Sequence, residues 1–200
     1  MMPRGDRRAE ILAVAERLFA SGRFHEVTLE DVAQEAKVGK GTIYRYFEDK
    51  EDLFVQTVTS GLDDLCDLLH AKVPEEAPFR EQLLSACGAI HSFFRGRHQA
   101  LRMMHTQVAR LLGGGERFRQ QVKAHRQQLV SAMAAIIAKG VAEGRVRRDV
   151  PPEILASVLL GMLHMWVRQE AGFPKAFRAP ETIVDLFCRG AGRQVGGRAE

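Results

Sequence analysis

Apolar residues recur every three or four positions along almost the whole chain, and this spacing constrains the fold more than any other feature. One such stripe comprises Ile11, Leu12, Ala15, Leu18 and Phe19, and a later one comprises Phe118, Val122, Leu129, Met133, Ile136 and Ile137. Residues three and four apart share one face of an α-helix, whereas a half-buried strand needs a period of two, which no run here shows. The sequence therefore predicts an all-α protein.

Capping and turn-forming residues divide the helices into a short N-terminal group and a longer C-terminal group. Thr28, with Asp31 three residues on, is typical of a capping box, and Asp49 is suited to cap the next long helix. Pro74 and Pro78 mark a break after that helix. We expect one domain over 5–65 and a helical bundle over 66–192, with bundle helices near 79–95, 98–112, 116–143, 152–170 and 180–190.

Composition and motif content exclude several classes of protein. The chain is 46% hydrophobic and 27% charged, which argues against disorder. Its three cysteines lie far apart, as expected of a reduced cytoplasmic chain, and neither a signal peptide nor an apolar run of membrane-spanning length is predicted. No pattern for a nucleophile with its base, a metal cluster or a phosphate loop occurs, so we expect no enzyme, no metal and no cofactor.

Net charge does not by itself point to nucleic acid. The formal charge of the chain is +4, but residues 1–64 hold nine basic and thirteen acidic side chains, which makes this segment net acidic. Only the local placement of basic residues can therefore argue for DNA binding. Positive charge concentrates instead between residues 95 and 126, where eight basic residues accompany a single acid.

Residues 28–47 describe a helix-turn-helix, in which two short helices are joined by about four residues. The second of these helices would lie in the major groove of DNA, with its first residues toward the base edges. Lys40 can reach a guanine or a phosphate there, Gly41 permits close approach, and Thr42 can contact a phosphate or a thymine methyl group. Ile43 and Phe47 would point the other way, into a small core.

Other candidate DNA contacts surround that end of the helix. Tyr44, Arg45 and Tyr46 would line the wall of the groove. Lys50 and Thr28 would each bind a phosphate. The alternative is that the aromatic pair closes a core, as in three-helix units that bind no DNA.

The chain resembles the tetracycline-repressor (TetR) family of regulators over about its first 65 residues. The resemblance is carried by TLEDVA from residue 28, AKVGKGTIYRYF from residue 36 and KEDL from residue 50. It implies an all-α homodimer that binds a palindromic operator, usually represses transcription, and is released by a small molecule in its C-terminal domain. The rival interpretation is a helical small-molecule-binding module without operator-specific DNA binding.

Two positions depart from the pattern of that family. Lys37 stands where glycine is usual, so we expect a differently shaped or slightly strained turn, because a left-handed backbone costs a non-glycine residue about 1 kcal/mol. Gly39 stands where serine is usual, and it can cap the helix but has no side chain for DNA. Lys37 is therefore a candidate to restore a DNA contact that Gly39 lacks.

The resemblance also implies an effector pocket and a dimer interface in the C-terminal half. Candidate pocket residues are His91, Phe94, Met103, Met104, Gln107, Met133, Ile137, Met162, Met165 and Trp166, although an apolar stripe at this spacing is also typical of an ordinary core. The basic segment 95–126 suggests an effector that is hydrophobic or anionic, such as an acyl-coenzyme A. The last two helices, with an apolar run over 154–167, would join two subunits.

Overall fold

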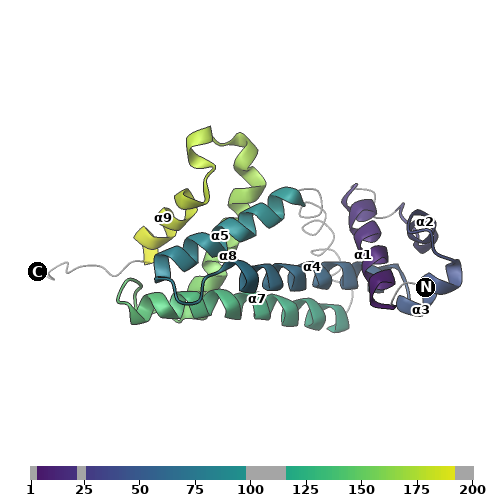
Figure 1. Ribbon diagram of the computed structural model, residues 1–200, viewed down its shortest axis with the longest axis horizontal. Helices are drawn as coiled ribbons and strands as arrows, with labels where there is room; N and C mark the ends of the chain where they lie inside the picture. The colour runs from purple at the N-terminus through teal and green to yellow at the C-terminus, as the bar shows by residue number, and fades with distance from the viewer. Residues whose placement is uncertain (1–3, 22–25, 98–115, 192–200) are drawn as a thin grey trace, which may run out of the picture. The chain divides into compact units, whose positions relative to one another are not determined.

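The computed structural model describes residues 4–21, 26–97 and 116–191, and within these ranges every regular element is helical (Figure 1). The predicted all-α fold is confirmed. The helices are α1 (Arg4–Ala20), α2 (Leu29–Glu35), α3 (Lys40–Tyr46), α4 (Lys50–Lys72), α5 (Phe79–Gly96), α7 (Glu116–Ala142), α8 (Pro152–Gln169) and α9 (Pro180–Ala191). The helix predicted at 98–112 lies outside the described residues. No helix in the described ranges is long and apolar enough to cross a membrane.

Two compact units divide the chain, and the division passes through α4 and α7. The first unit takes residues 1–64 and 97–125, and the second takes 65–96 and 126–200. Domain limits at 5–65 and 66–192 stay a prediction, because helices shared by both units leave no single point at which one domain ends.

The first unit is built around the apolar stripe of α1. Phe19 of α1 meets Phe54 of α4 edge to face, with ring centroids 5.5 Å apart. Ile43 and Phe47 close the same core from the side of α3. Since α2 packs on both α1 and α3, this core fixes the angle at which α3 is presented. The fully enclosed members are Ile11, Ala15, Phe19, Val32, Ile43, Leu53 and Phe54.

Polar contacts tie the long helices to this core. Arg8 on α1 donates to the side-chain oxygen of Gln56 on α4 at 2.7 Å. The His125 ring on α7 lies 2.6 Å from a carboxylate oxygen of Asp63 on α4. These four side chains line a polar hollow of about 320 Å³. Because they bond one another, they hold α1, α4 and α7 together and are not available as a group to bind a ligand.

In the second unit α5 packs against both α8 and α9, which also contact each other (Figure 1). The start of α5 is bound to the end of α7, since the Phe79 N–H donates to the Glu143 carboxylate at 3.0 Å. Gly140 allows this approach: a Cβ at that position would lie 2.7 Å from the Phe79 ring. The side chain of residue 79 therefore occupies the space that any other residue at 140 would need.

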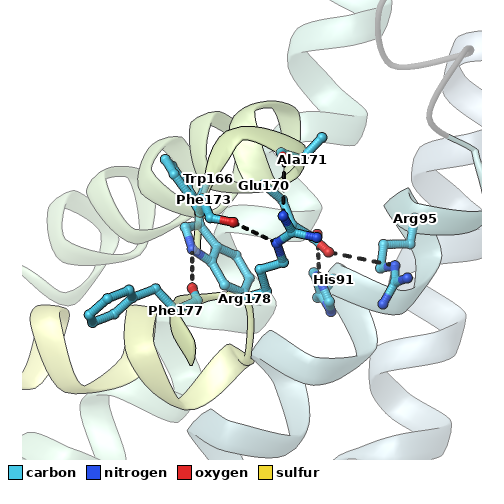
Figure 2. A network of polar contacts seen from close by, with 8 residues as sticks. All are labelled: His91, Arg95, Trp166, Glu170, Ala171, Phe173, Phe177 and Arg178. Atoms are coloured by element: carbon cyan, nitrogen blue, oxygen red, sulfur yellow. Dashed lines mark hydrogen bonds and ion pairs between the residues drawn. The ribbon is translucent and has the colours of Figure 1, made fainter. Parts of the chain in front are cut away.

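The connection between α8 and α9 contains two short 3₁₀ turns, η1 (Glu170–Gly172) and η2 (Lys175–Phe177). Figure 2 shows how they are fastened. The Trp166 indole N–H donates to the Phe177 carbonyl at 3.2 Å, and the Arg178 guanidinium donates to the carbonyl of Phe173 at 2.8 Å. The sequence predicts only the helices on either side of this stretch, near 152–170 and 180–190, because these bonds depend on side chains that meet after α8 and α9 have packed.

Candidate functional site

Helix α2 begins with the predicted capping box. The Thr28 hydroxyl oxygen accepts from the Asp31 N–H at 3.1 Å, and the Thr28 N–H donates to the Asp31 carboxylate at 2.8 Å. The hydrogen bonds from Thr28 also hold the pKa of Asp31 below its usual value. Aspartate thus performs the part that glutamate usually has, and the start of α2 is fixed.

The turn after α2 has a left-handed lysine. Lys37 has a φ of +53°, which confirms the strained conformation predicted for this position. The Val38 N–H reaches the Ala33 carbonyl at 2.9 Å and the Lys37 N–H reaches the Gln34 carbonyl at 3.1 Å, the two bonds of a Schellman motif. The turn therefore keeps the hydrogen bonds that a glycine would give, at a conformational cost of about 1 kcal/mol.

Helix α3 starts at an N-cap that has no side chain. Gly39 has extended backbone angles, φ −69° and ψ 150°, and no side-chain cap bond. A Cβ placed there would meet only the Thr42 hydroxyl oxygen, at 4.0 Å. The position is thus open to a larger residue.

We predict that Gly39→Ser stabilises the protein by about 0.3 kcal/mol, because a serine hydroxyl can accept from an orphan N–H in the first turn of α3. Gly39→Ala fills the same space without an acceptor, and the two variants should differ by about 1 kcal/mol. Urea unfolding followed by circular dichroism measures this difference. Equal stabilities would show that the first turn of α3 gains nothing from a cap.

The two faces of α3 have different roles. Ile43 and the adjoining Phe47 are buried in the core, as predicted. Tyr46 is half-buried against the same core, and the Arg45 guanidinium lies 5.2 Å from its ring centroid. The outer face consists of Lys40, Gly41, Tyr44 and Arg45.

Of the remaining candidate DNA contacts, three are exposed and two are half-buried. Thr28, Lys37 and Gly39 are exposed, while Thr42 and Lys50 are half-buried. Thr28 and Lys50 each stand at a helix start, next to α2 and at the first residue of α4. All five thus lie at or beside the helix-turn-helix.

A carboxylate on α2 contacts the outer face of α3, and the sequence analysis missed it. Glu30 lies 2.6 Å from the Lys40 ammonium, and the Tyr44 hydroxyl donates to the same carboxylate oxygen at 3.2 Å. The hydrogen bond from Lys40 lowers the pKa of Glu30, and the same bond raises the pKa of Lys40. Glu30 precedes Lys40 by ten residues, a spacing with no periodic signal, so only the docking of α2 on α3 reveals the pair.

The predicted effector residues are brought together only in part. The His91 and Trp166 rings contact each other at a tilt of 40°, with centroids 5.0 Å apart, and Phe94 lies near His164. The His91 ring also hydrogen-bonds with the buried Glu170 carboxylate at 2.7 Å (Figure 2). Glu170, at the end of the apolar run, had no sequence signal as a polar partner.

The other pocket candidates have differing surroundings. Met133 and Ile137 are fully buried in α7, and Met162 is half-buried on α8. Met165 is 47% exposed. Met103, Met104 and Gln107 lie outside the described residues. Assignment of these ten residues to a pocket stays a prediction.

Helices α8 and α9 leave large apolar side chains uncovered. Leu155, Leu159 and Leu163 face inward on α8, but Ile154 and Val158 are 54% and 52% exposed. Met165 continues this outer stripe on α8. On α9, Leu186 is 57% exposed while its neighbour Phe187 is buried. Helices α8 and α9 contact each other, and large exposed apolar side chains on neighbouring helices are typical of a surface that a partner covers.

Comparison with known proteins finds matches to both halves of the chain. Residues 11–57 match the family described as bacterial regulatory proteins, tetR family, and residues 76–190 match the tetracyclin repressor-like C-terminal domain. An uncharacterized HTH-type transcriptional regulator of Bacillus subtilis, YhgD, is 28% identical over 91% of this chain and 93% of its own. A fatty acid metabolism regulator protein of the same species is 19% identical over 77% of this chain and 78% of its own.

Solved structures of low sequence identity share the fold. The fatty acid degradation regulator FadR from Bacillus halodurans superposes with a TM-score of 0.79 at 16% identity, covering 98% of this chain and all of its own. FadR from Bacillus subtilis, in complex with stearoyl-CoA, has a TM-score of 0.76 at 19% identity, covering 91% of this chain and 98% of its own.

Proposed function

This chain belongs to the tetR family of bacterial regulatory proteins, and we propose that it is a homodimeric repressor that a small molecule releases from a palindromic operator. The protein is a transcriptional regulator with an N-terminal helix-turn-helix domain and a C-terminal helical domain. The observation that carries the proposal is the outer face of α3, which a capped and well-packed unit presents to solvent. A cytoplasmic location is expected for a regulator that acts on bacterial DNA.

On DNA, the outer face of α3 would enter the major groove. Lys40 and Arg45 carry the donors that guanine edges and phosphates accept, and Tyr44 adds a flat ring with a hydroxyl. The candidates around it, Thr28, Lys37, Gly39, Thr42, Tyr46 and Lys50, would position the helix through phosphate and sugar. Few residues would therefore contact bases and determine sequence specificity. Many more would contact the DNA backbone and fix the position of α3 along the groove.

The apolar stripe of α8 and α9 supports a two-fold dimer. A two-fold axis brings the same surface of each subunit together, so the exposed Val158 and Leu186 would each be covered by the partner. Such a dimer presents two copies of α3 to two half-sites, which is why a palindromic operator is expected.

For the effector we propose an acyl-coenzyme A or another hydrophobic anion. Support comes from the relatives named as fatty acid regulators, one of them solved with stearoyl-CoA, and from the eight basic residues between 95 and 126. His91, Phe94, Met133, Ile137 and Trp166 are candidates to line the apolar part of the site. Four of them are buried and Phe94 is half-buried, and mostly apolar surroundings of this kind suit an acyl chain better than a polar molecule.

DNA binding is tested by gel shift with DNA from upstream of the protein's own gene, followed by selection from random duplexes. We expect a selected sequence with two-fold symmetry. If no duplex is bound in either experiment, the protein is a helical small-molecule-binding module instead.

Effector binding is tested by thermal shift. Long-chain acyl-coenzyme A at saturating concentration should raise Tm and dissociate the operator complex, with free coenzyme A and free fatty acid as controls. An unchanged Tm would exclude this effector class.

A further inference from the structure

The cation at the start of α3 is already engaged within the protein. The Lys40 ammonium and the Glu30 carboxylate are 2.6 Å apart, and their side chains are 69% and 47% exposed. An ion pair this open to water contributes little to folding stability. The ion pair therefore matters more for what Lys40 can bind at the surface than for folding stability.

Lys40 is also the first residue of α3, at the end of the helix that would approach the base edges. Proteins gain affinity for DNA when a cation neutralises a phosphate and releases a condensed counterion. A lysine that already bonds a carboxylate must exchange that partner for phosphate, and the freed carboxylate then stands near a polyanion. The Tyr44 hydroxyl bonds the same carboxylate, so Glu30 engages two of the four residues on the outer face of α3.

The other carboxylates of α2 are engaged elsewhere. Asp31 belongs to the capping box with Thr28. Glu35 pairs with Arg17 on α1, at 2.6 Å. Within the contacts of the described residues, Glu30 is thus the α2 carboxylate that bonds the outer face of α3.

We propose that Glu30 is an intramolecular competitor of DNA phosphate for Lys40, which weakens binding to DNA of any sequence and makes the operator complex depend on its base contacts. This inference rests on the proposed DNA-binding function. Under this proposal Glu30, an acidic residue beside the helix that would enter the major groove, determines how tightly the protein binds DNA. The net negative charge of residues 1–64 also weakens binding to DNA, but it does not act on one particular cation.

The test is Glu30→Gln, which keeps the size of the side chain and removes its charge. Freeing one cation should steepen the dependence of log K on log salt by about 0.9 per protomer that engages DNA, and tighten binding to a random duplex about 8-fold per protomer at about 0.1 M salt. Glu35→Gln on the same helix is the matched control. It changes the charge of the domain equally and should leave the salt slope unchanged, because Arg17 is on α1.

A second comparison isolates Lys40. In a Lys40→Gln background, Glu30→Gln should no longer steepen the salt slope, since no cation remains to be freed. A full slope change in that background, or an equal change from Glu35→Gln, would overturn the proposal in favour of general charge. If the wild-type protein binds DNA and Glu30→Gln binds no better, this inference alone fails; if the wild type binds no duplex at all, the proposed function fails with it.

Discussion

Val158→Glu is expected to separate the protein into monomers and to weaken operator binding about 100-fold or more. Val158 stands on the outer stripe of α8, with Ile154 one turn before it. Across a two-fold axis, two introduced carboxylates would be buried near each other without partners, which disfavours association strongly. Loss of the dimer also removes the avidity of two linked half-site contacts, typically at least about 100-fold.

Light scattering after gel filtration measures the mass, and gel shift measures operator affinity. The matched control is Ala135→Glu, which places the same charge on an exposed position of α7. That variant should stay dimeric and bind as the wild type does. A dimeric Val158→Glu protein would show that α8 is not the subunit interface.

His91→Leu is expected to lower the free energy of unfolding by about 3 kcal/mol, because it leaves a buried carboxylate without its hydrogen-bonding partner. The side chain of Glu170 is only 11% exposed, and the Arg95 guanidinium lies farther from its carboxylate, at 3.7 Å. The ring contact between the imidazole and Trp166 is lost as well. For a chain of this length the change corresponds to a fall in Tm of roughly 10 °C.

The double variant His91→Leu/Glu170→Met separates the effect of the hydrogen bond from that of ordinary packing. Replacing both partners by apolar residues removes the buried charge, so most of the lost stability should return. Urea unfolding of the two single variants and the double variant completes the cycle. A double variant as unstable as His91→Leu would show that the imidazole acts through packing and not through Glu170.

The features that the sequence predicted well are those controlled by neighbours along the chain. The capping box at Thr28 and Asp31 depends on three-residue spacing. The strained turn at Lys37 is instead expected from the resemblance to the TetR family, in which glycine is usual at that position. The inward positions of Ile43 and Phe47 follow from the helical period. Local rules of this kind need no knowledge of the tertiary fold.

The features that it could not predict join residues that only packing brings together. His91 and Glu170 are 79 residues apart, and Glu30 meets Lys40 only because α2 and α3 dock at one particular angle. Each pair joins a carboxylate to a basic side chain, but the chain has many other carboxylates, so the sequence alone does not single out the partner. For the same reason, the sequence predicts a DNA contact for Lys40 but gives no sign that its ammonium already pairs with Glu30.

The chain's tyrosines and tryptophan have a consequence for spectroscopy. Both tyrosines, Tyr44 and Tyr46, are in α3, and the single tryptophan, Trp166, is in α8. Light at the long-wavelength edge of protein absorption excites tryptophan alone, so its emission reports the second unit and the His91 imidazole that contacts the indole. Tyrosine signals come from α3, the helix proposed to enter the major groove. The molecule therefore holds two native optical reporters, one in the helix-turn-helix and one in the C-terminal helical domain, and neither requires a label.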